Sequence, residues 1–276
     1  MYKVNKWEAS VVSIKKIGII AIIVIILGAA LNIGMSIAGG FIKNTEEIEL
    51  TKEFKRIDIT GDNTAIEVVR SSGSNGKVEF ISKKSSRSKI QAYVKGDTLH
   101  VEMKKKFFNG FFNLGFNASG NKIVVSVPDE KYEELTTQTD NGRIIVNNLQ
   151  FETVDIQSNN GKIEMEDLES NKVNVKTDNG KIEFHYVTGD IVAKSDNGQI
   201  SMVTDDIDRD ISLETDNGLI NIRTNTEPKN ATIHADIDNG RIDIFGSANE
   251  ETIFGNGKNI IDLKTDNGVI SLKKGN

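Results

Sequence analysis

One short pattern recurs seven times in the second half of the chain: Asn-Gly is followed two residues later by Ile and preceded by Asp, or once by Asn. Successive glycines of the pattern are 19, 19, 18, 20, 22 and 28 residues apart. Such a period indicates one supersecondary unit whose copies stack on each other. We call each copy an Asp-Asn-Gly corner, and the predicted structural turn residues are Asn141, Gly142, Asn160, Gly161, Asn179, Gly180, Asn197, Gly198, Asn217, Gly218, Asn239, Gly240, Asn267 and Gly268.

The residues on both sides of each corner alternate between apolar and polar types, which is the pattern of a strand with one buried face. The residue before Asp is Thr or Ser in most copies, and we expect it to face inward together with the Ile after the corner. Each unit therefore reads as strand, corner, strand and second corner. In one unit the expected inward residues are Val173, Val175, Thr177, Ile182, Phe184 and Tyr186.

Two all-β folds are compatible with this unit. Asn-Gly between alternating strands is a strong hairpin signal, since a type I′ turn needs two residues with positive φ, and this would give an antiparallel meander. The alternative is a β-solenoid (β-helix) with coils of about 19 residues and like positions stacked about 4.8 Å apart. We favour the solenoid because the Asp-Asn-Gly corner is constant while the second corner varies, as in Asn148-Leu149-Gln150, Thr188-Gly189-Asp190, Asp205–Asp210 and Glu227-Pro228-Lys229.

An N-terminal transmembrane helix is predicted at residues 17–42. Residues 17–38 contain no charged side chain and are long enough to cross a hydrocarbon core of roughly 30 Å. The basic stem, residues 1–16, is expected in the cytoplasm and the rest of the chain outside, by the positive-inside rule. Cleavage after Ser36-Ile37-Ala38 as a signal peptide, giving a secreted protein, is the alternative.

The exported part is expected to have three regions. Residues 43–51 form a juxtamembrane link, residues 52–130 an N-terminal β region of the solenoid, and residues 131–276 the repeat solenoid. Ser74-Asn75-Gly76 resembles a degenerate copy of the corner.

Composition excludes several classes of function. There is no Cys, which excludes disulfides, thiol catalysis and Cys-ligated zinc. Residues 131–276 hold 15 basic and 27 acidic side chains, so a nucleic-acid partner is not expected. No hydrolase or phosphate-binding motif is present, so we predict that the protein is not an enzyme and needs no cofactor. The histidines His100, His185 and His234 are expected to point to solvent from strands.

The acidic residues suggest one metal hypothesis. The Asp of each corner could bind Ca²⁺ in a ladder, with Asp178, Asp196 and Asp216 as candidates, or it could accept hydrogen bonds from backbone N–H groups of its own turn. The second reading is favoured, because the denser glycine and aspartate pattern of calcium-binding β-rolls is missing. The run Asp205, Asp206, Asp208 and Asp210 is expected to be a solvated surface rather than a metal site.

A basic and Phe-rich loop, residues 104–120, is the main candidate for contact with a membrane or partner. The reading favoured for the loop itself, however, is that its aromatic side chains plug the open end of the solenoid, because solenoids need capped ends. A separate, less favoured site for polysaccharide is the row Lys162, Glu164, Lys181 and Glu183. The candidate contact residues of the loop are Lys104, Lys105, Lys106, Phe107, Phe108, Phe111, Phe112 and Phe116.

The Thr/Ser-Asp-Asn-Gly-x-Ile units, with the alternating region that ends in Val125-Ser126-Val127-Pro128 and the single apolar span, resemble a bacterial family of β-strand-repeat proteins of unknown function. Some members are called putative adhesins, and the family includes membrane-anchored proteins of the Lia envelope-stress operon. The resemblance covers residues 50–275 and implies a β-helix-like fold at the cell envelope. It supplies no catalytic residues.

The predicted function is a membrane-anchored, extracytoplasmic interaction or adhesion module of the cell envelope, with an envelope protein or a cell-wall glycan as partner. The alternatives are a β-helix that binds or cleaves cell-wall polysaccharide and a calcium-stabilised surface protein.

Overall fold

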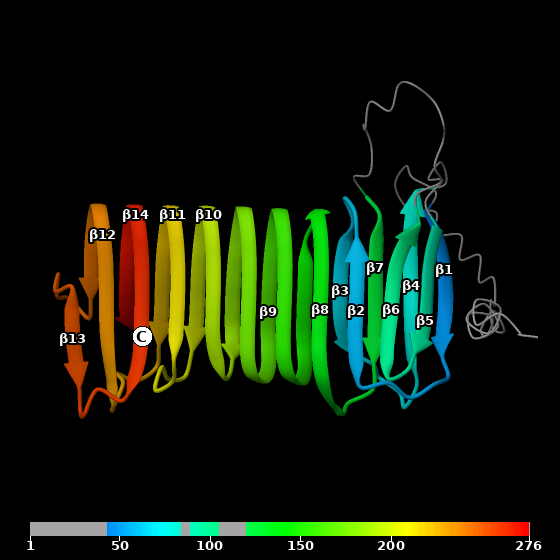
Figure 1. Ribbon diagram of the computed structural model, residues 1–276, viewed down its shortest axis with the longest axis horizontal. Helices are drawn as coiled ribbons and strands as arrows, with labels where there is room; N and C mark the ends of the chain where they lie inside the picture. The colour runs from blue at the N-terminus through cyan, green and yellow to red at the C-terminus, as the bar shows by residue number, and fades with distance from the viewer. Residues whose placement is uncertain (1–42, 84–88, 105–119, 276) are drawn as a thin grey trace, which may run out of the picture.

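The computed structural model describes residues 43–83, 89–104 and 120–275. In these residues one sheet of 14 strands winds into an elongated stack (Figure 1). The described residues contain no helix that is long and apolar enough to cross a membrane, and the segment 17–42 lies outside them. The strands are β1 (Lys43–Leu50), β2 (Arg56–Gly61), β3 (Ala65–Arg70), β4 (Gly76–Lys83), β5 (Lys89–Lys95), β6 (Thr98–Lys104), β7 (Lys122–Val127), β8 (Lys131–Asn141), β9 (Ile144–Val187), β10 (Asp190–Thr204), β11 (Ile211–Thr224), β12 (Ala231–Ile244), β13 (Glu251–Phe254) and β14 (Asn259–Lys274).

The repeats form a parallel β-solenoid, as predicted, and the antiparallel meander is wrong. Neighbouring coils pair in parallel with each corner beside the next, so that Ile200 of β10 lies between Ile182 of β9 and Ile220 of β11. No corner Asn has a positive φ, and among the corner glycines only Gly240 does. The type I′ turn is therefore absent, because its two central residues both need positive φ.

A continuous asparagine ladder runs along the corners. Each corner amide Nδ2 donates to the Oδ1 of the Asn in the adjacent coil on the side of the N-terminal strands, over 2.9–3.2 Å. The ladder extends one coil further than the sequence pattern, because Asn141 also donates to Asn63. The copy expected at Ser74-Asn75-Gly76 is not a corner, since Gly76 begins β4 and pairs antiparallel with β1.

The corner glycines are required for close stacking. A Cβ atom at Gly198 would lie 1.7 Å from the carbonyl oxygen of Gly180, and one at Gly218 would lie 1.7 Å from that of Gly198. Real Cβ atoms do not approach backbone oxygen so closely, so a side chain would force the coils apart. Glycine is needed here for lack of a side chain rather than for its φ.

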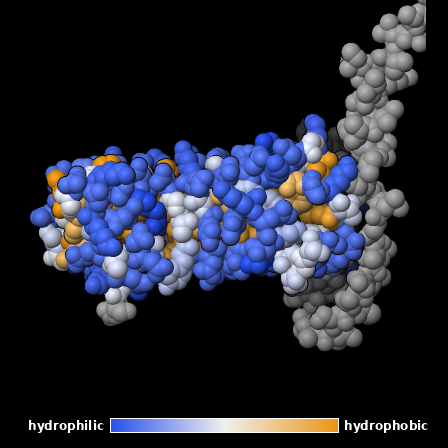
Figure 2. All heavy atoms as spheres, turned by 90° about the horizontal axis from the view of Figure 1, so that it is seen from below, coloured by the Kyte–Doolittle hydropathy of each residue, from blue (hydrophilic) through white to orange (hydrophobic). Residues whose placement is uncertain are grey.

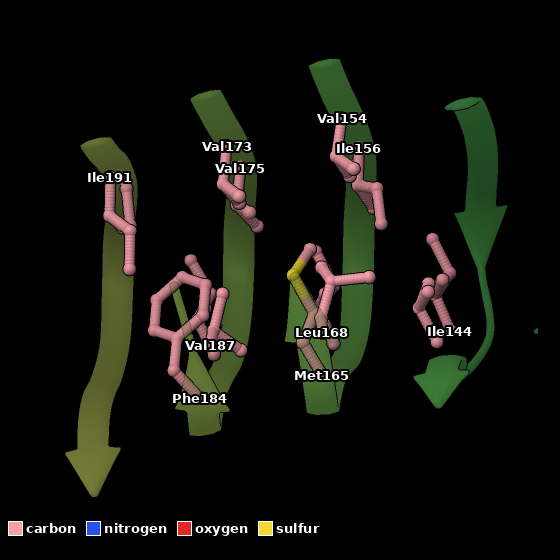
Figure 3. Packing of buried hydrophobic residues seen from close by; sticks show 14 of the residues in the cluster. Ile144, Val154, Ile156, Met165, Leu168, Val173, Val175, Phe184, Val187 and Ile191 are labelled. Carbon is pink, nitrogen blue, oxygen red and sulfur yellow. The ribbon is translucent and has the colours of Figure 1, made fainter. Parts of the chain in front are cut away.

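The expected inward faces are largely confirmed. The corner Ile residues are at most 8% exposed, and Thr177, Ser195 and Thr215 are fully buried. The hydroxyl of Thr215 donates to the Gly198 carbonyl over 3.2 Å. Figure 3 shows residues of successive coils, including Val154, Val173 and Ile191, at like positions in the core. Burying each such aliphatic side chain contributes roughly 1.5–3 kcal/mol.

The expectation for Tyr186 is wrong, because this side chain is exposed and Val187 is buried instead. Tyr186 has a φ of 53°, and the equivalent residues one and two coils earlier, Asp167 and Asn148, have φ values of 49° and 55°. This left-handed residue turns the chain, so two outward residues follow one another before the next inward one. The second corner is thus regular in the first coils, whereas the sequence predicts a corner that varies freely.

The coils near the C-terminal end do not follow sequence order. β14 lies between β11 and β12 and pairs in parallel with both along its length (Figure 1). The chain passes over one coil position, forms β12 at the end of the stack, returns through β13, and fills the position with β14. The 28-residue interval between the last two glycines contains this return.

The N-terminal part joins the same core with mixed strand directions. β2 and β3 continue the two sides of the solenoid in parallel with β8 and β9. β4 pairs antiparallel with β1 and β7, and β5 pairs antiparallel with β6. The structure thus places strand β1 inside the segment expected to be a link.

Candidate interaction surface

The solenoid has two long outer faces. Face A consists of the outward residues that precede the corner in each coil, and face B of those that follow it. Parallel register brings like positions of successive coils into rows. A central row of face A is Asn174, Val192, Ser212, Asp262 and His234, and the equivalent row of face B nearest the corner is Lys181, Gln199, Leu219, Val269 and Arg241.

Face A has a shallow hollow over β10, β11 and β14. It is lined by the outward residues Asp190, Val192, Asp210, Ser212, Ile260 and Asp262. Ser212 lies in register between Val192 and Asp262, so a small side chain forms the floor. Figure 2 shows the molecule from below the view of Figure 1, and on that side apolar residues form small patches between hydrophilic ones.

Two aliphatic side chains of the hollow are exposed, Val192 at 45% and Ile260 at 38%. Single exposed apolar residues are ordinary, but two of the five large exposed hydrophobic residues in the described part of the chain lie here, in one concave place with three carboxylates. Asp210 accepts a hydrogen bond from the Ile260 backbone N–H over 2.8 Å, which fixes one wall. The hollow can therefore contact a ligand through both apolar and acidic groups.

The acidic run beside the hollow is part of the structure of a corner. Asp208 accepts hydrogen bonds from the backbone N–H groups of Lys229 and Asn230, both over 2.9 Å. Arg209 packs under this corner and donates to the Val187 carbonyl over 2.9 Å. Burial lowers the pKa of Arg209, while Asp206 opposes this shift. The run is thus more strongly bonded than the solvated surface that the sequence suggested.

The corner carboxylates proposed for calcium, those of Asp178, Asp196 and Asp216, are partly exposed. Within the described residues they accept no hydrogen bond, so the expected bonds to their own turn are missing. Nowhere in the described part of the chain do three or more acidic or histidine side chains form a group that could hold a metal ion. Lys194 supplies nearby positive charge, and its hydrogen bond to Glu214, followed by Asp216 and Asp196, raises its pKa.

The row suggested for polysaccharide lies on face B and is an ion-pair network. Lys162 and Lys181 both contact Glu183, and Lys162 and Arg143 both contact Glu164. Partial burial raises the pKa of Glu183, but the hydrogen bonds from the two lysines outweigh it and lower the pKa to about 2. Glu183 is therefore ionised near neutral pH and is not a proton donor there.

The histidines lie on the outer faces, but two are paired rather than free. His100 Nδ1 lies 3.0 Å from an Asp58 carboxylate oxygen, and its ring stacks on Tyr93 at 5.2 Å between centroids. His234 lies 3.5 Å from Glu251.

The candidate residues of the Phe-rich loop lie almost entirely outside the described residues. Of its candidate residues, only the backbone of Lys104, at the end of β6, is described; the side chain of Lys104 and residues 105–116 lie outside the described residues.

Two features of the structure lie outside the sequence predictions, and only the second has a signal in the sequence. The hollow depends on coil order, since Ile260 reaches Asp210 only because β14 lies beside β11. Asn63 had a weak signal, because Asp62-Asn63 is followed by Ile66 at the corner spacing, with Thr64 in place of Gly.

A search of curated proteins found no match to this sequence. Among solved structures, a "putative cell adhesion protein" from Clostridium sporogenes ATCC 15579 is similar, with 14% identity, a TM-score of 0.43, and coverage of 84% of this chain and 100% of that one. A "putative adhesin" from Bacteroides fragilis NCTC 9343 has 15% identity and a TM-score of 0.44, covering 84% and 97%. A "Putative lipid binding protein" from Parabacteroides distasonis ATCC 8503 has 13% identity and a TM-score of 0.29, covering 84% and 97%.

The family comparison is decisive, because two overlapping matches cover residues 54–185 and 142–273, which is most of the chain. Their overlap falls within the stacked coils, as expected when one repeat unit can align in more than one register. The chain belongs to the Toastrack DUF4097 family.

Proposed function

We propose that this protein is a membrane-anchored, extracytoplasmic interaction module of the bacterial cell envelope that works without catalysis. The observation that supports it most is the hollow on face A, where exposed aliphatic side chains and carboxylates meet on a rigid sheet. A rigid surface loses little conformational entropy when it binds a partner. The charged row on face B is already occupied by its own ion pairs, so face A is the better candidate for an external partner.

The proposed anchor is the apolar segment 17–42. Because β1 begins at Lys43, an anchor there would hold the N-terminal end of the solenoid near the membrane. Face A runs from the edge strand β5 through β6, β2, β8 and two successive coils of β9 to β10. This path has six inter-strand steps, because β9 contributes two coils. At about 4.8 Å per step the hollow would stand about 30 Å from that edge, within reach of a partner in the wall. A role in envelope stress is part of the same proposal.

Anchoring is tested by immunoblotting the membrane fraction of cells that express the full chain. A band at the unprocessed mass in the membrane fraction is expected. A shorter product in the culture medium would refute the anchor and favour secretion after cleavage.

The contact surface is tested by crosslinking in intact cells. Because the chain has no Cys, Val192→Cys carries a thiol-reactive crosslinker at one defined place. Glu166→Cys on face B is the matched control, since its side chain is also exposed. We expect a discrete product from position 192 that an excess of the purified protein competes away. Equal products from both positions, or none from position 192, would refute face A as the contact surface.

A further inference from the structure

The outermost corner differs chemically from the corners inside the stack, although all seven share the Asn-Gly sequence. Each interior Asn donates its amide to one neighbour and accepts from the other. Asn239 in β12 is the last member of the ladder and donates to Asn267 over 3.2 Å. Within the described residues its own Oδ1 accepts no hydrogen bond.

The backbone at the outermost corner pairs with β14 on its inner side, but within the described residues no strand pairs with it on its outer side. Gly142 donates its N–H to the Asn160 carbonyl of the next coil over 3.1 Å, and its carbonyl points toward the same coil. By register, the N–H of Gly240 points away from β14 toward the open end of the stack. β13 covers β12 only at Ala231–His234, so the described residues place no strand beside Gly240.

We infer that Asn239 is a site of spontaneous covalent modification, its conversion to aspartate or isoaspartate, while the interior corner asparagines are protected. The backbone nitrogen of Gly240, after losing its proton to solvent, attacks Asn239 Cγ. A C–N bond forms, the Cγ–Nδ2 bond breaks, and ammonia leaves. Water then opens the resulting succinimide at either carbonyl, which gives a carboxylate on a normal or a lengthened backbone.

The reaction needs a solvent-accessible backbone N–H at Gly240 and an Asn239 side chain that can rotate until its Cγ lies beside that nitrogen. Asn239, Gly240 and Arg241 are all exposed, and Gly240 carries no side chain that would hinder the attack. At Asn197 the same movement would break two ladder bonds and disturb the strand pairing of Gly198 with Gly218. A group held by hydrogen bonds reacts only after those bonds open, so local opening sets the rate.

The modification would change the free edge of the solenoid. A new carboxylate at position 239 joins Asp236 and Asp238, which are both exposed on the same strand. Charged groups on an edge strand oppose pairing with another chain. The isoaspartate form also lengthens the backbone by one atom and removes the register that an added strand would need.

The test is to incubate the purified full-length protein at mildly alkaline pH in water enriched in oxygen-18 and to map its peptides by mass spectrometry. Aspartate and isoaspartate that carry the label should form at Asn239 at least about ten times faster than at Asn179, Asn197 and Asn217, since fewer hydrogen bonds must open. In denaturant the four positions should react at similar rates. Equal rates in the folded protein, or a slower rate at Asn239, would overturn the inference.

Hydrogen exchange supplies an independent measurement. The amide of Gly240 should exchange as an unprotected group, while those of Gly198 and Gly218 should be protected. Protection of Gly240 equal to that of Gly218 would show that the edge is covered and would also overturn the inference.

Discussion

The interior coils and the outermost coil carry the same corner but bear different constraints. Inside the stack a corner contacts a copy on each side, so its Asn makes two amide bonds and its Gly lies against backbone oxygen in the coil before it. In β12 half of these contacts are missing. A repeat protein is stabilised through nearest-neighbour interfaces, so the position of a residue in the stack, rather than its motif, determines what it contributes.

The strongest way to test this comparison is to add a methyl group at an interior corner. Gly198→Ala should destabilise the fold by about 4 kcal/mol or more, because its Cβ would overlap the Gly180 carbonyl. Gly73→Ala is the control, since no atom lies within 4 Å of its added Cβ, and it should change stability by less than about 0.5 kcal/mol. Urea unfolding measures both, and a similar loss in the two variants would contradict the stacking argument.

Removing an apolar side chain comes next in size. Ile200→Ala should cost about 2–5 kcal/mol, because Ile200 is fully buried between the corner Ile residues of the adjacent coils. Ile253→Ala is the comparison in the end strand β13, where the side chain is 59% exposed and a loss below about 1 kcal/mol is expected. Thermal unfolding of both variants checks the difference, and equal losses would mean that the end strand is as tightly packed as the interior.

The asparagine ladder gives a smaller effect that sharpens the same contrast. Asn197→Ala removes two amide bonds and should cost about 1–3 kcal/mol, whereas Asn239→Ala removes one and should cost about half as much. The two free energies of unfolding can be compared by urea titration. A larger loss at position 239 than at position 197 would contradict the nearest-neighbour picture.

The ion pairs on face B predict a pH dependence. The pKa of Glu183 is lowered to about 2 from an ordinary value of 4.5, so its pairing stabilises the folded state fully above about pH 5. This contribution, on the order of 1 kcal/mol at an outer face, is lost as the pH falls toward 2. Unfolding free energies measured across this range should show a flatter profile for Glu183→Gln than for the wild type. An unchanged profile would remove Glu183 from the acid response.

Much of the repeat region could be predicted from sequence, because its signal is local and repeated. Period-two alternation placed Val173, Val175 and Ile182 in the core, and the constant corner favoured parallel stacking over hairpins. Tyr186 could not be placed, since a left-handed bend interrupts the alternation without any Gly to announce it. Asn63 was missed because Thr64 replaces the glycine that defines the pattern.

The hollow on face A could not be predicted, because its residues come from strands whose order in space differs from their order in the chain. Asp210 and Ile260 are 50 residues apart in sequence and meet only through the position of β14. Periodicity identifies which side of a strand faces outward, but it does not say which outward side chains become neighbours.

The sequence by itself determined the repeating coil, the inward columns of Ile and Thr or Ser, and the parallel stacking of the corners. Only the tertiary structure decided that β14 lies between β11 and β12, that Asn63 extends the ladder, and that Asn239 ends it. The physical reason is that every corner presents nearly the same surface to its neighbours, so local pattern does not distinguish one stacking order from another. Chain connectivity and the packing of the β13 return select the order, and with it the face A hollow and the free edge at Gly240.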